Sequence, residues 1–253
     1  MPRPGQLRGR ADRRGRGDGR GDTRRQNGSA QVTIDITLYG IVDPQIANGR
    51  SMADMARAAV EGGATLIQLR AKTETTREMV REARAIRSAL HGTNVPLLIN
   101  DRVDVALAAG ADGVHLGADD MKLVDARRLL GPRAIIGATL KHESELPELA
   151  SAKIDYACIG GVFPTTHKDN AGAALGVDGL KALRQAAARA LGMLPVGAIA
   201  GITAANAGSV IAAGADGVAV IGALFGGDDI SEAARDLRLA IETALSERVP
   251  ASA

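Results

Sequence analysis

The stretch Leu97–Asp120 constrains the fold of this chain more than any other segment. It begins with a short apolar run that stops at Asn100-Asp101, and a helical pattern of apolar residues follows until Gly110. A second apolar run then stops at Asp119-Asp120. A strand, a helix and a strand within so short a segment indicate a βαβ unit, from which parallel sheets are built.

The same alternation of apolar runs and helical patterns continues along the rest of the chain. We expect strands at Ile36–Ile41, Leu66–Leu69, Pro96–Ile99, Gly113–Leu116, Ala134–Ala138, Tyr156–Ile159, Pro195–Ile199 and Gly217–Ile221. We expect helices at Met52–Glu61, Thr76–Leu90, Val103–Ala109, Lys122–Leu130, Glu143–Ala150, Asp178–Leu191, Ala204–Ala213 and Ser231–Leu245. Repeated strand–helix pairs over this length predict an α/β fold, the (β/α)8 TIM barrel. A doubly wound sheet is the alternative.

A short repeat marks the return from helix to strand. AAGADGV occurs at Ala108–Val114 and at Ala212–Val218, and the related EGGATLI spans Glu61–Ile67. Each copy combines a helix end, a glycine that tolerates positive φ and the entry into a strand. We therefore expect one turn used three times at the lower end of the barrel, with Asp112 and Asp216 holding the turn backbone.

Residues 1–30 differ in composition from the rest of the chain. They contain nine Arg and three Asp and hardly any apolar residues, so they cannot bury enough surface to offset the entropy lost on ordering. We expect a disordered Arg/Gly-rich tail at 1–30 and a single folded domain at 31–253. The tail is either a segment that binds RNA or anionic surfaces or an inert leader, and its composition leaves both open.

Composition argues against several classes of protein. The sequence has neither the apolar segment of a secretory signal nor a run of about 18 apolar residues that would span a membrane. Its single cysteine, Cys158, excludes an internal disulfide and fits a reducing compartment, so we expect a cytoplasmic protein. Aromatic residues make up only 2%, which argues against a base-stacking surface and a specific nucleic-acid partner. A homo-oligomer is left open.

Polar side chains follow the predicted strands at their carboxyl ends, the edge at which parallel α/β folds bind ligands. The second strand leads into Gln68, Arg70 and Lys72, which strand alternation places on one side. The third strand ends at Asn100-Asp101, and the fourth carries His115 and leads to Asp119-Asp120. Carboxylates on one rim need a counter-charge, and Mg²⁺, which takes one or two carboxylates with substrate phosphate oxygens, is the cofactor we expect there.

The later loops suggest a second binding region at the same rim. The loop at 160–170 is long, polar and glycine-rich, and is a candidate lid. The loops at 197–203 and 220–223 consist of small residues before a helix, a setting in which backbone N–H groups bind phosphate. The polar groups at this rim therefore predict two anion sites. One would hold a diphosphate through Mg²⁺ near the cations Arg70, Lys72 and Lys168. The other would hold a monophosphate through backbone N–H groups.

Several of these residues also have a structural explanation. Arg70 and Lys72 would then only neutralise Asp101 or Glu74, and Asp119-Asp120 would cap the helix that follows. Three more residues have explanations of this kind: His115 as a hydrogen-bonded barrel residue, Cys158 as core packing and His167 as a solvent-facing loop residue.

Four segments resemble the thiamine-phosphate synthase family: QLRAK at 68–72, LINDRVDVALAAGADGVHLG at 98–117 with Asp120 beyond it, VFPTTHKDN at 162–170 and GADGVAVI at 214–221. The resemblance covers about residues 36–240 in the same order and spacing. It implies an enzyme that joins 4-amino-2-methyl-5-hydroxymethylpyrimidine diphosphate to 4-methyl-5-(2-hydroxyethyl)thiazole phosphate, giving thiamine phosphate and diphosphate.

The resemblance also implies a role for each matching residue. The diphosphate would be held by Arg70, Lys72, Asn100 and Lys168, and Mg²⁺ by Asp101 and Asp120. Gln68 would line the pyrimidine pocket and Thr165 would approach the thiazole, with Thr139 and His167 also in contact with substrate. The thiazole phosphate would bind the loops at Ala200-Gly201 and at Val220, Ile221 and Gly222.

Such a reaction needs no general base and no covalent nucleophile. The electron-rich aminopyrimidine stabilises the carbocation left when the diphosphate departs, and the thiazole nitrogen attacks it. What the reaction needs is charge stabilisation on the leaving group, which Mg²⁺ together with Arg70, Lys72 and Lys168 would provide. The sequence shows no convincing Ser-His-Asp or Cys-His set, which agrees with this chemistry.

The chain departs from the family's common residues at several positions. The family commonly has Gln where this chain has Ala118, Pro where it has Gly161, and Ser or Thr where it has His167. The family also commonly has Ser where this chain has Thr139 and Gly222, and Gly where it has Ala200. Thr139 keeps a hydroxyl, and Gly222 keeps its backbone N–H.

Three other functions compete with the synthase. A related thiazole tautomerase would not use the diphosphate and would not require the full set of cations and carboxylates. Another phosphate-binding barrel enzyme, of the isomerase or aldolase kind, would want an acid–base pair at the mouth that the sequence does not clearly show. A non-enzymatic RNA-binding protein would depend on the basic tail.

Overall fold

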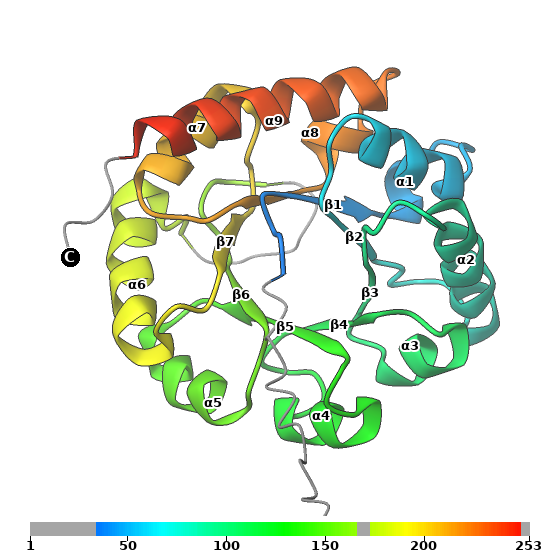
Figure 1. Cartoon of the computed structure of the whole chain (residues 1–253), viewed down its shortest axis with the longest axis horizontal. Helices are drawn as coiled ribbons and strands as arrows, with labels where there is room; N and C mark the ends of the chain where they lie inside the picture. Colours follow the sequence, from blue (N-terminus) through cyan, green and yellow to red (C-terminus); the bar gives the residue numbers. More distant parts are fainter. Residues whose placement is uncertain (1–33, 166–172, 249–253) are drawn as a thin grey trace, which may run out of the picture. The chain divides into compact units, whose positions relative to one another are not determined.

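The computed structural model describes residues 34–165 and 173–248. In this part of the chain, eight parallel strands close into a barrel in which each strand pairs with its neighbour in sequence and β8 pairs with β1 (Figure 1). The strands are β1 (Leu38–Val42), β2 (Leu66–Leu69), β3 (Leu97–Asn100), β4 (Gly113–Leu116), β5 (Ile135–Leu140), β6 (Tyr156–Ile159), β7 (Val196–Ile199) and β8 (Val218–Val220). The closed topology confirms the (β/α)8 prediction and excludes the open, doubly wound sheet.

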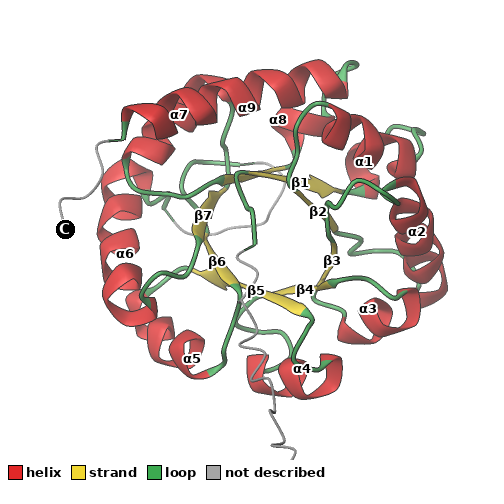
Figure 2. Ribbon diagram, in the orientation of Figure 1, coloured by secondary structure: helices red, strands yellow, loops and turns green. Residues whose placement is uncertain are grey.

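Helices form a ring around the barrel (Figure 2). They are α1 (Met52–Glu61), α2 (Thr76–Ala89), α3 (Val103–Ala109), α4 (Leu123–Leu130), α5 (Leu146–Ser151), α6 (Gly176–Leu191), α7 (Ala204–Ala212), α8 (Gly222–Phe225) and α9 (Ile230–Glu247), with the 3-10 turns η1 (Pro44–Ile46) and η2 (Glu143–Glu145). Every predicted element occurs, and η2 and α5 together form the helix expected at 143–150. The sequence did not predict η1 or α8, because elements this short show no helical period.

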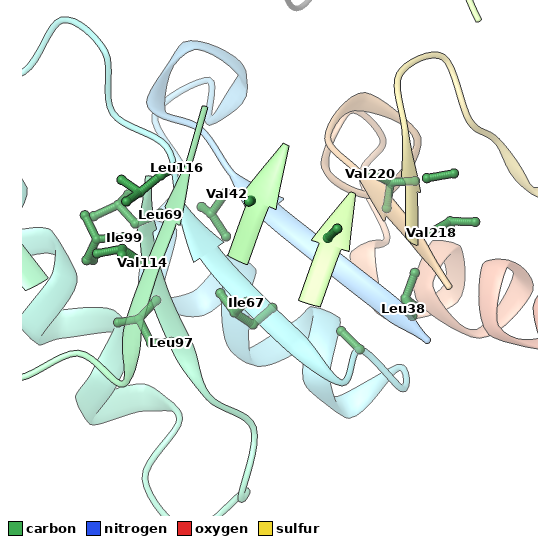
Figure 3. Close-up of a cluster of buried hydrophobic side chains, with 14 of the residues drawn as sticks. Leu38, Val42, Ile67, Leu69, Leu97, Ile99, Val114, Leu116, Val218 and Val220 are labelled. Atoms are coloured by element: carbon green, nitrogen blue, oxygen red, sulfur yellow. The ribbon is translucent and has the colours of Figure 1, made fainter. Parts of the chain in front are cut away.

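Side chains alternate along each strand between the helices and the barrel interior. In β2, Ile67 and Leu69 belong to the large core between strands and helices, which also contains Ile99 of β3 (Figure 3). Leu66, on the other face of β2, packs in a smaller core inside the barrel. Gln68 shares this inner face, as strand alternation predicted, and is therefore aimed into the barrel.

A turn side chain fastens the lower end of every second strand to its neighbour. In each case a carboxylate or hydroxyl before an even-numbered strand accepts the N–H of a residue at the start of the preceding strand or one residue beyond it. The pairs are Thr65 with Leu38 (3.2 Å), Asp112 with Leu97 (2.8 Å), Asp155 with Ile136 (2.8 Å) and Asp216 with Val196 (2.9 Å). The expectation that Asp112 and Asp216 hold turn backbone is confirmed, and the same contact recurs at two further turns.

Two glycines in these turns allow neighbouring strands to approach closely. A Cβ atom at Gly113 would lie 1.8 Å from the carbonyl oxygen of Ile135, and one at Gly217 would lie 1.9 Å from that of Ile36. No side chain fits into such a gap, so the glycine after the aspartate in each AAGADGV repeat is a requirement of barrel closure.

Some expectations fall outside the described residues. The basic tail at 1–30 is among them, so its disorder and the domain boundary at residue 31 stay predictions. The same holds for residues 166–172 of the candidate lid, which include His167 and Lys168. In the described part of the chain, none of the helices combines the length and the apolar character needed to cross a bilayer. Cys158 is buried as a free thiol, as its interpretation as core packing predicted.

Candidate active site

A cavity of about 530 Å³ opens at the carboxyl ends of the strands. Ten residues that the sequence placed at the site line this cavity: Gln68, Arg70, Asn100, Thr139, Thr165, Ala200, Gly201, Val220, Ile221 and Gly222. They come from several strands and the loops after them, so closure of the barrel brings them together. Lys72, Asp101 and Asp120 are not part of the cavity wall. Asp120 lines a smaller neighbouring pocket.

Gln68 is the best-buried polar residue of the site. It is 1% exposed, and its side-chain oxygen Oε1 has no hydrogen-bond partner among the described residues. A buried acceptor without a donor costs about 1–3 kcal/mol. Because Gln68 also lines the cavity, a ligand that carries an N–H or O–H group would satisfy this oxygen.

Arg70 is paired with Asp43, which the sequence did not predict as part of the site. Its Nη1 atom donates to Oδ2 of Asp43, and the Asp43 side chain is almost fully buried. The structural alternative that joined Arg70 to Asp101 or Glu74 is therefore wrong, although Lys72 does pair with Asp101 as that alternative expected.

Asp101 and Asp120 lie close together beside the cavity. Burial raises the pKa of the Asp120 carboxyl, and the adjacent Asp101 carboxyl raises it further. Oδ2 of Asp120 accepts the N–H of Gly117 at 2.7 Å, while Lys72 donates to Oδ2 of Asp101. Two neighbouring carboxylates beside a single lysine favour a divalent cation, so the residues fit the expected metal.

Other ligands of such a cation would have to come from solvent or substrate. Within the described residues, no group of three or more His, Cys, Asp and Glu side chains is placed to hold a metal. Mg²⁺ commonly uses one or two carboxylates and completes its shell with water and phosphate oxygens. A pair of aspartates is therefore a sufficient protein contribution for this ion.

The alternative role for Asp119-Asp120 as a helix cap is wrong. Helix α4 begins at Leu123, one residue later than predicted, and its N-cap residue is Lys122. No side chain makes a capping hydrogen bond there. The carboxylate of Asp120 instead reaches back to the end of β4, where it binds Gly117.

His115 belongs to a hydrogen-bonded chain inside the barrel. Its Nδ1 atom lies 2.9 Å from the Tyr156 hydroxyl, and its Nε2 atom lies 2.9 Å from Oγ1 of Thr139. The Tyr156 hydroxyl donates in turn to that of Tyr39 at 2.9 Å. The interpretation of His115 as a hydrogen-bonded barrel residue is confirmed, and the chain fixes Thr139 in the cavity wall.

The opposite side of the cavity is formed mainly by backbone. Ala200 and Gly201 both have positive φ, at 95° and 63°, and a Cβ atom at Gly201 would lie 2.5 Å from the carbonyl oxygen of Pro164. After β8, the cavity wall continues through Ile221 into Gly222, where α8 begins. The first N–H groups of a helix lack intrahelical acceptors, so this wall offers donors but no charged side chain.

Sequence reasoning missed three residues of the site: Asp43, Lys141 and Tyr39. Asp43 follows β1 as Asp101 follows β3, so the rule that strand ends carry the site would have found it if applied to the first strand. Lys141 follows β5 and lines the cavity in the same way. Tyr39 lies within β1, where nothing in the sequence distinguishes it from core packing.

Comparisons with known proteins agree on one family. The family model described as thiamine monophosphate synthase matches residues 38–224. A thiamine-phosphate synthase of Agrobacterium fabrum is 52% identical over 217 residues, covering 86% of this chain and 99% of that protein. One from Chloroflexus aurantiacus is 44% identical, covering 81% of this chain and 92% of that protein.

Solved structures give the same result for the fold. A structure described as thiamine phosphate pyrophosphorylase from Pyrococcus furiosus matches with a TM-score of 0.73 and 36% identity, covering 84% of this chain and 98% of that one. Tryptophan synthase of Mycobacterium tuberculosis matches with a TM-score of 0.63 at 15% identity, which shows a shared barrel only.

Proposed function

Since the chain belongs to the thiamine monophosphate synthase family, a family of enzymes of thiamine biosynthesis, we propose that it forms thiamine phosphate by metal-assisted departure of diphosphate. The substrates would be 4-amino-2-methyl-5-hydroxymethylpyrimidine diphosphate and 4-methyl-5-(2-hydroxyethyl)thiazole phosphate. The C–O bond to the diphosphate breaks first, and the thiazole nitrogen then forms the new C–N bond to the same carbon.

The observation that carries this proposal is a single cavity with two different ends. One end has the Arg70 guanidinium, with the Asp101–Asp120 pair beside it, and the other end is the backbone around Gly201 and Gly222. A condensation needs both substrates in contact, and a volume of about 530 Å³ lies in the range of pockets that hold drug-sized ligands. One end suits a diphosphate with its cation, and the other suits a monophosphate.

Asp101 and Asp120 would hold Mg²⁺, which, when bound, would neutralise the negative charge that grows on the departing diphosphate. Arg70 and Lys72 would donate hydrogen bonds to the same leaving group, and Asn100 would add its amide group. Lys168, which lies outside the described residues, would complete this set. These contacts strengthen as charge develops, so they lower the barrier more than they tighten substrate binding.

Gln68 would recognise the pyrimidine. Its unpartnered Oε1 lies at the cavity wall, and the exocyclic amino group of the pyrimidine is a donor that would satisfy it. A pyrimidine without that amino group would leave the oxygen buried and unpaired, which costs about 1–3 kcal/mol. The same amino group makes the ring electron-rich, so recognition and carbocation stability depend on one substituent.

The thiazole phosphate would bind the backbone side, with Ala200-Gly201 and Val220–Gly222 around the phosphate. Thr165 lines the cavity and would approach the thiazole ring, whereas His167 lies outside the described residues. Thr139 keeps the hydroxyl of the serine common in the family and is fixed by His115. A phosphate bound to these two loops would be held by backbone N–H donors.

The deciding experiment is an assay of the purified chain with both substrates and Mg²⁺, with and without EDTA. Thiamine phosphate formed only with the metal supports both the reaction and the cofactor. If product forms equally well in EDTA, the synthase activity is supported but the assignment of Mg²⁺ is wrong. Absence of product, with thiazole phosphate still bound in a separate titration, would favour a thiazole tautomerase.

A further inference from the structure

Asp43 is a buried carboxylate at the edge of the site with no assigned role in the reaction. It is 2% exposed and directly follows β1. The register of β1 against β2 pairs Val42 with Leu69, so the residues that follow the two strands, Asp43 and Arg70, lie side by side. A carboxylate this deeply buried is stable only when its oxygens are hydrogen-bonded.

Both oxygens of Asp43 have a partner. Oδ1 accepts the N–H of Gln45 at 2.9 Å, at the start of η1, and Oδ2 accepts from Nη1 of Arg70. The backbone contact fixes the carboxylate, and the fixed carboxylate then holds one edge of the guanidinium.

The rest of the Arg70 guanidinium remains available to a ligand. Its side chain is 15% exposed and lines the cavity. Within the described residues, Asp43 is the only hydrogen-bond acceptor that this guanidinium contacts. A guanidinium has five N–H donors in a planar fork, so an oxyanion can bind the edge that Asp43 leaves open.

We propose that Asp43 is a positioning residue: it clamps one edge of Arg70 so that the other edge faces the oxygens of the departing diphosphate. This role rests on the proposed function, because it requires diphosphate as the leaving group. Asp43 does not touch the substrate and acts only through Arg70.

Two opposite effects of Asp43 make the proposal testable. Its negative charge offsets that of Arg70, which by itself weakens the attraction of any anion. Its clamp removes the rotamer freedom of a long side chain, which favours one geometry of the leaving group. A site built for tight binding alone would leave Arg70 unpaired, so the pairing is expected to support turnover more than ground-state binding.

The variants Asp43→Asn and Asp43→Ser remove the negative charge and the clamp together. Asn preserves the shape of the side chain, and with its oxygen on the Gln45 N–H its NH2 group faces Arg70, where it cannot accept a hydrogen bond. Ser can still accept the Gln45 N–H, but its shorter side chain no longer spans to the guanidinium. We expect kcat to fall about 10- to 100-fold, because misplaced catalytic groups cost rates of this order. The KM for thiazole phosphate should be unchanged. The Kd of inorganic diphosphate with Mg²⁺, measured by calorimetry, should change less than about threefold, because the lost clamp and the freed charge act in opposite directions.

Asp155 provides a matched control at the other end of the barrel. Its carboxylate also binds one backbone N–H, that of Ile136 at 2.8 Å, and one arginine, Arg127 at 2.7 Å. Asp155→Asn therefore loses the same kinds of contact far from the cavity. Thermal melts should show destabilisation in both variants, but only Asp43→Asn should lose kcat.

A double variant decides whether Asp43 acts through Arg70. In an Arg70→Ala background, Asp43→Asn should cause no further loss of kcat, because the group it positions is gone. A further tenfold loss in that background, or a full kcat in both Asp43 variants, would overturn the role of Asp43 while leaving the proposed function intact. A wild-type protein without turnover would overturn the proposed function itself.

Discussion

Asp101 lies directly after β3 with φ 61°, a left-handed conformation that aspartate adopts more readily than most residues. Its N–H donates to the carbonyl oxygen of His115 at 3.0 Å, so this hydrogen bond to β4 fixes the backbone that carries the Asp101 carboxylate. We predict that Asp101→Ala lowers kcat about 100-fold or more, because the Mg²⁺ that we propose it holds and the stabilisation of the leaving group would be lost together. Steady-state kinetics over a range of Mg²⁺ concentrations measures this effect.

Asp104 supplies the control for that substitution. It lies three residues further along, pairs with Arg102 on the exposed surface of α3 and has no contact with the cavity. Asp104→Ala removes the same charge and should retain wild-type rates. Near-normal turnover in Asp101→Ala would contradict the assignment of Asp101 to the metal.

Ala200 carries backbone strain in the loop after β7. Its φ of 95° lies in a region that side chains disfavour. Relief of this strain outweighs the added flexibility of glycine in the unfolded chain. We therefore predict that Ala200→Gly raises the free energy of unfolding by up to about 1 kcal/mol.

Chemical denaturation measures this change against a neighbouring control. Ala198 lies buried within β7, outside the positive-φ residues of the described chain. Ala198→Gly should therefore lower stability by about 1 kcal/mol, as glycine does in a strand. A loss of stability in Ala200→Gly equal to that in Ala198→Gly would show that residue 200 is not strained.

At the scale of elements, glycine allows neighbouring strands of the barrel to approach each other closely. Gly113 begins β4, and the carbonyl oxygen of Ile135 in β5 occupies the space of its missing side chain at 1.8 Å. We predict that Gly113→Ala destabilises the barrel by more than about 3 kcal/mol, since overpacking against rigid backbone cannot relax locally. Thermal unfolding and soluble yield report this change.

Gly208 in α7 tests whether the effect belongs to the position or to the substitution. The nearest atom to a Cβ there is the Cβ of Ala244, at 4.0 Å. Gly208→Ala should therefore raise stability by about 0.5–1 kcal/mol, the usual gain from alanine in a helix. If both alanine variants changed stability equally, strand spacing would not explain Gly113.

At the scale of the whole molecule, the barrel interior should respond to alkaline pH. Burial raises the pKa of the Cys158 thiol to about 12 and raises the pKa values of Tyr39 and Tyr156 well above their usual range. The folded state therefore retains protons that the unfolded chain releases. We predict that the free energy of unfolding is at its full value below about pH 9 and falls as pH rises from there towards 12.

Urea unfolding at a series of pH values from about 7 to 10.5 checks this trend. Cys158→Ala removes one of the three titrating groups, so its stability should decline less steeply above about pH 9 than that of the wild type. Stability that rises with pH in this range would show that these groups are not buried in solution as they are in the structure.

The sequence was sufficient for the order of the elements and for much of the cavity wall. Gln68 illustrates why: strand alternation has a period of two, so its inward orientation follows once β2 is placed. With η2 and α5 taken together, helix ends were predicted to within two residues, and both ends of α1 and α3 were correct. Elements without a period, such as α8, could not be predicted.

Pairing between side chains required the tertiary structure. Arg70 had several acidic candidates in sequence, and only the register of β1 against β2 places Asp43 beside it. The same applies to the chain from Tyr39 through Tyr156 and His115, in which residues far apart in sequence meet inside the barrel.

Taken alone, the sequence determined the barrel and the rim at which polar groups collect, because apolar periodicity and strand-end chemistry are local properties of the chain. Only the tertiary structure decided which carboxylates are paired, which are adjacent and which polar atom is left without a partner. Those properties depend on distances between strands, and the distances exist only after the barrel closes.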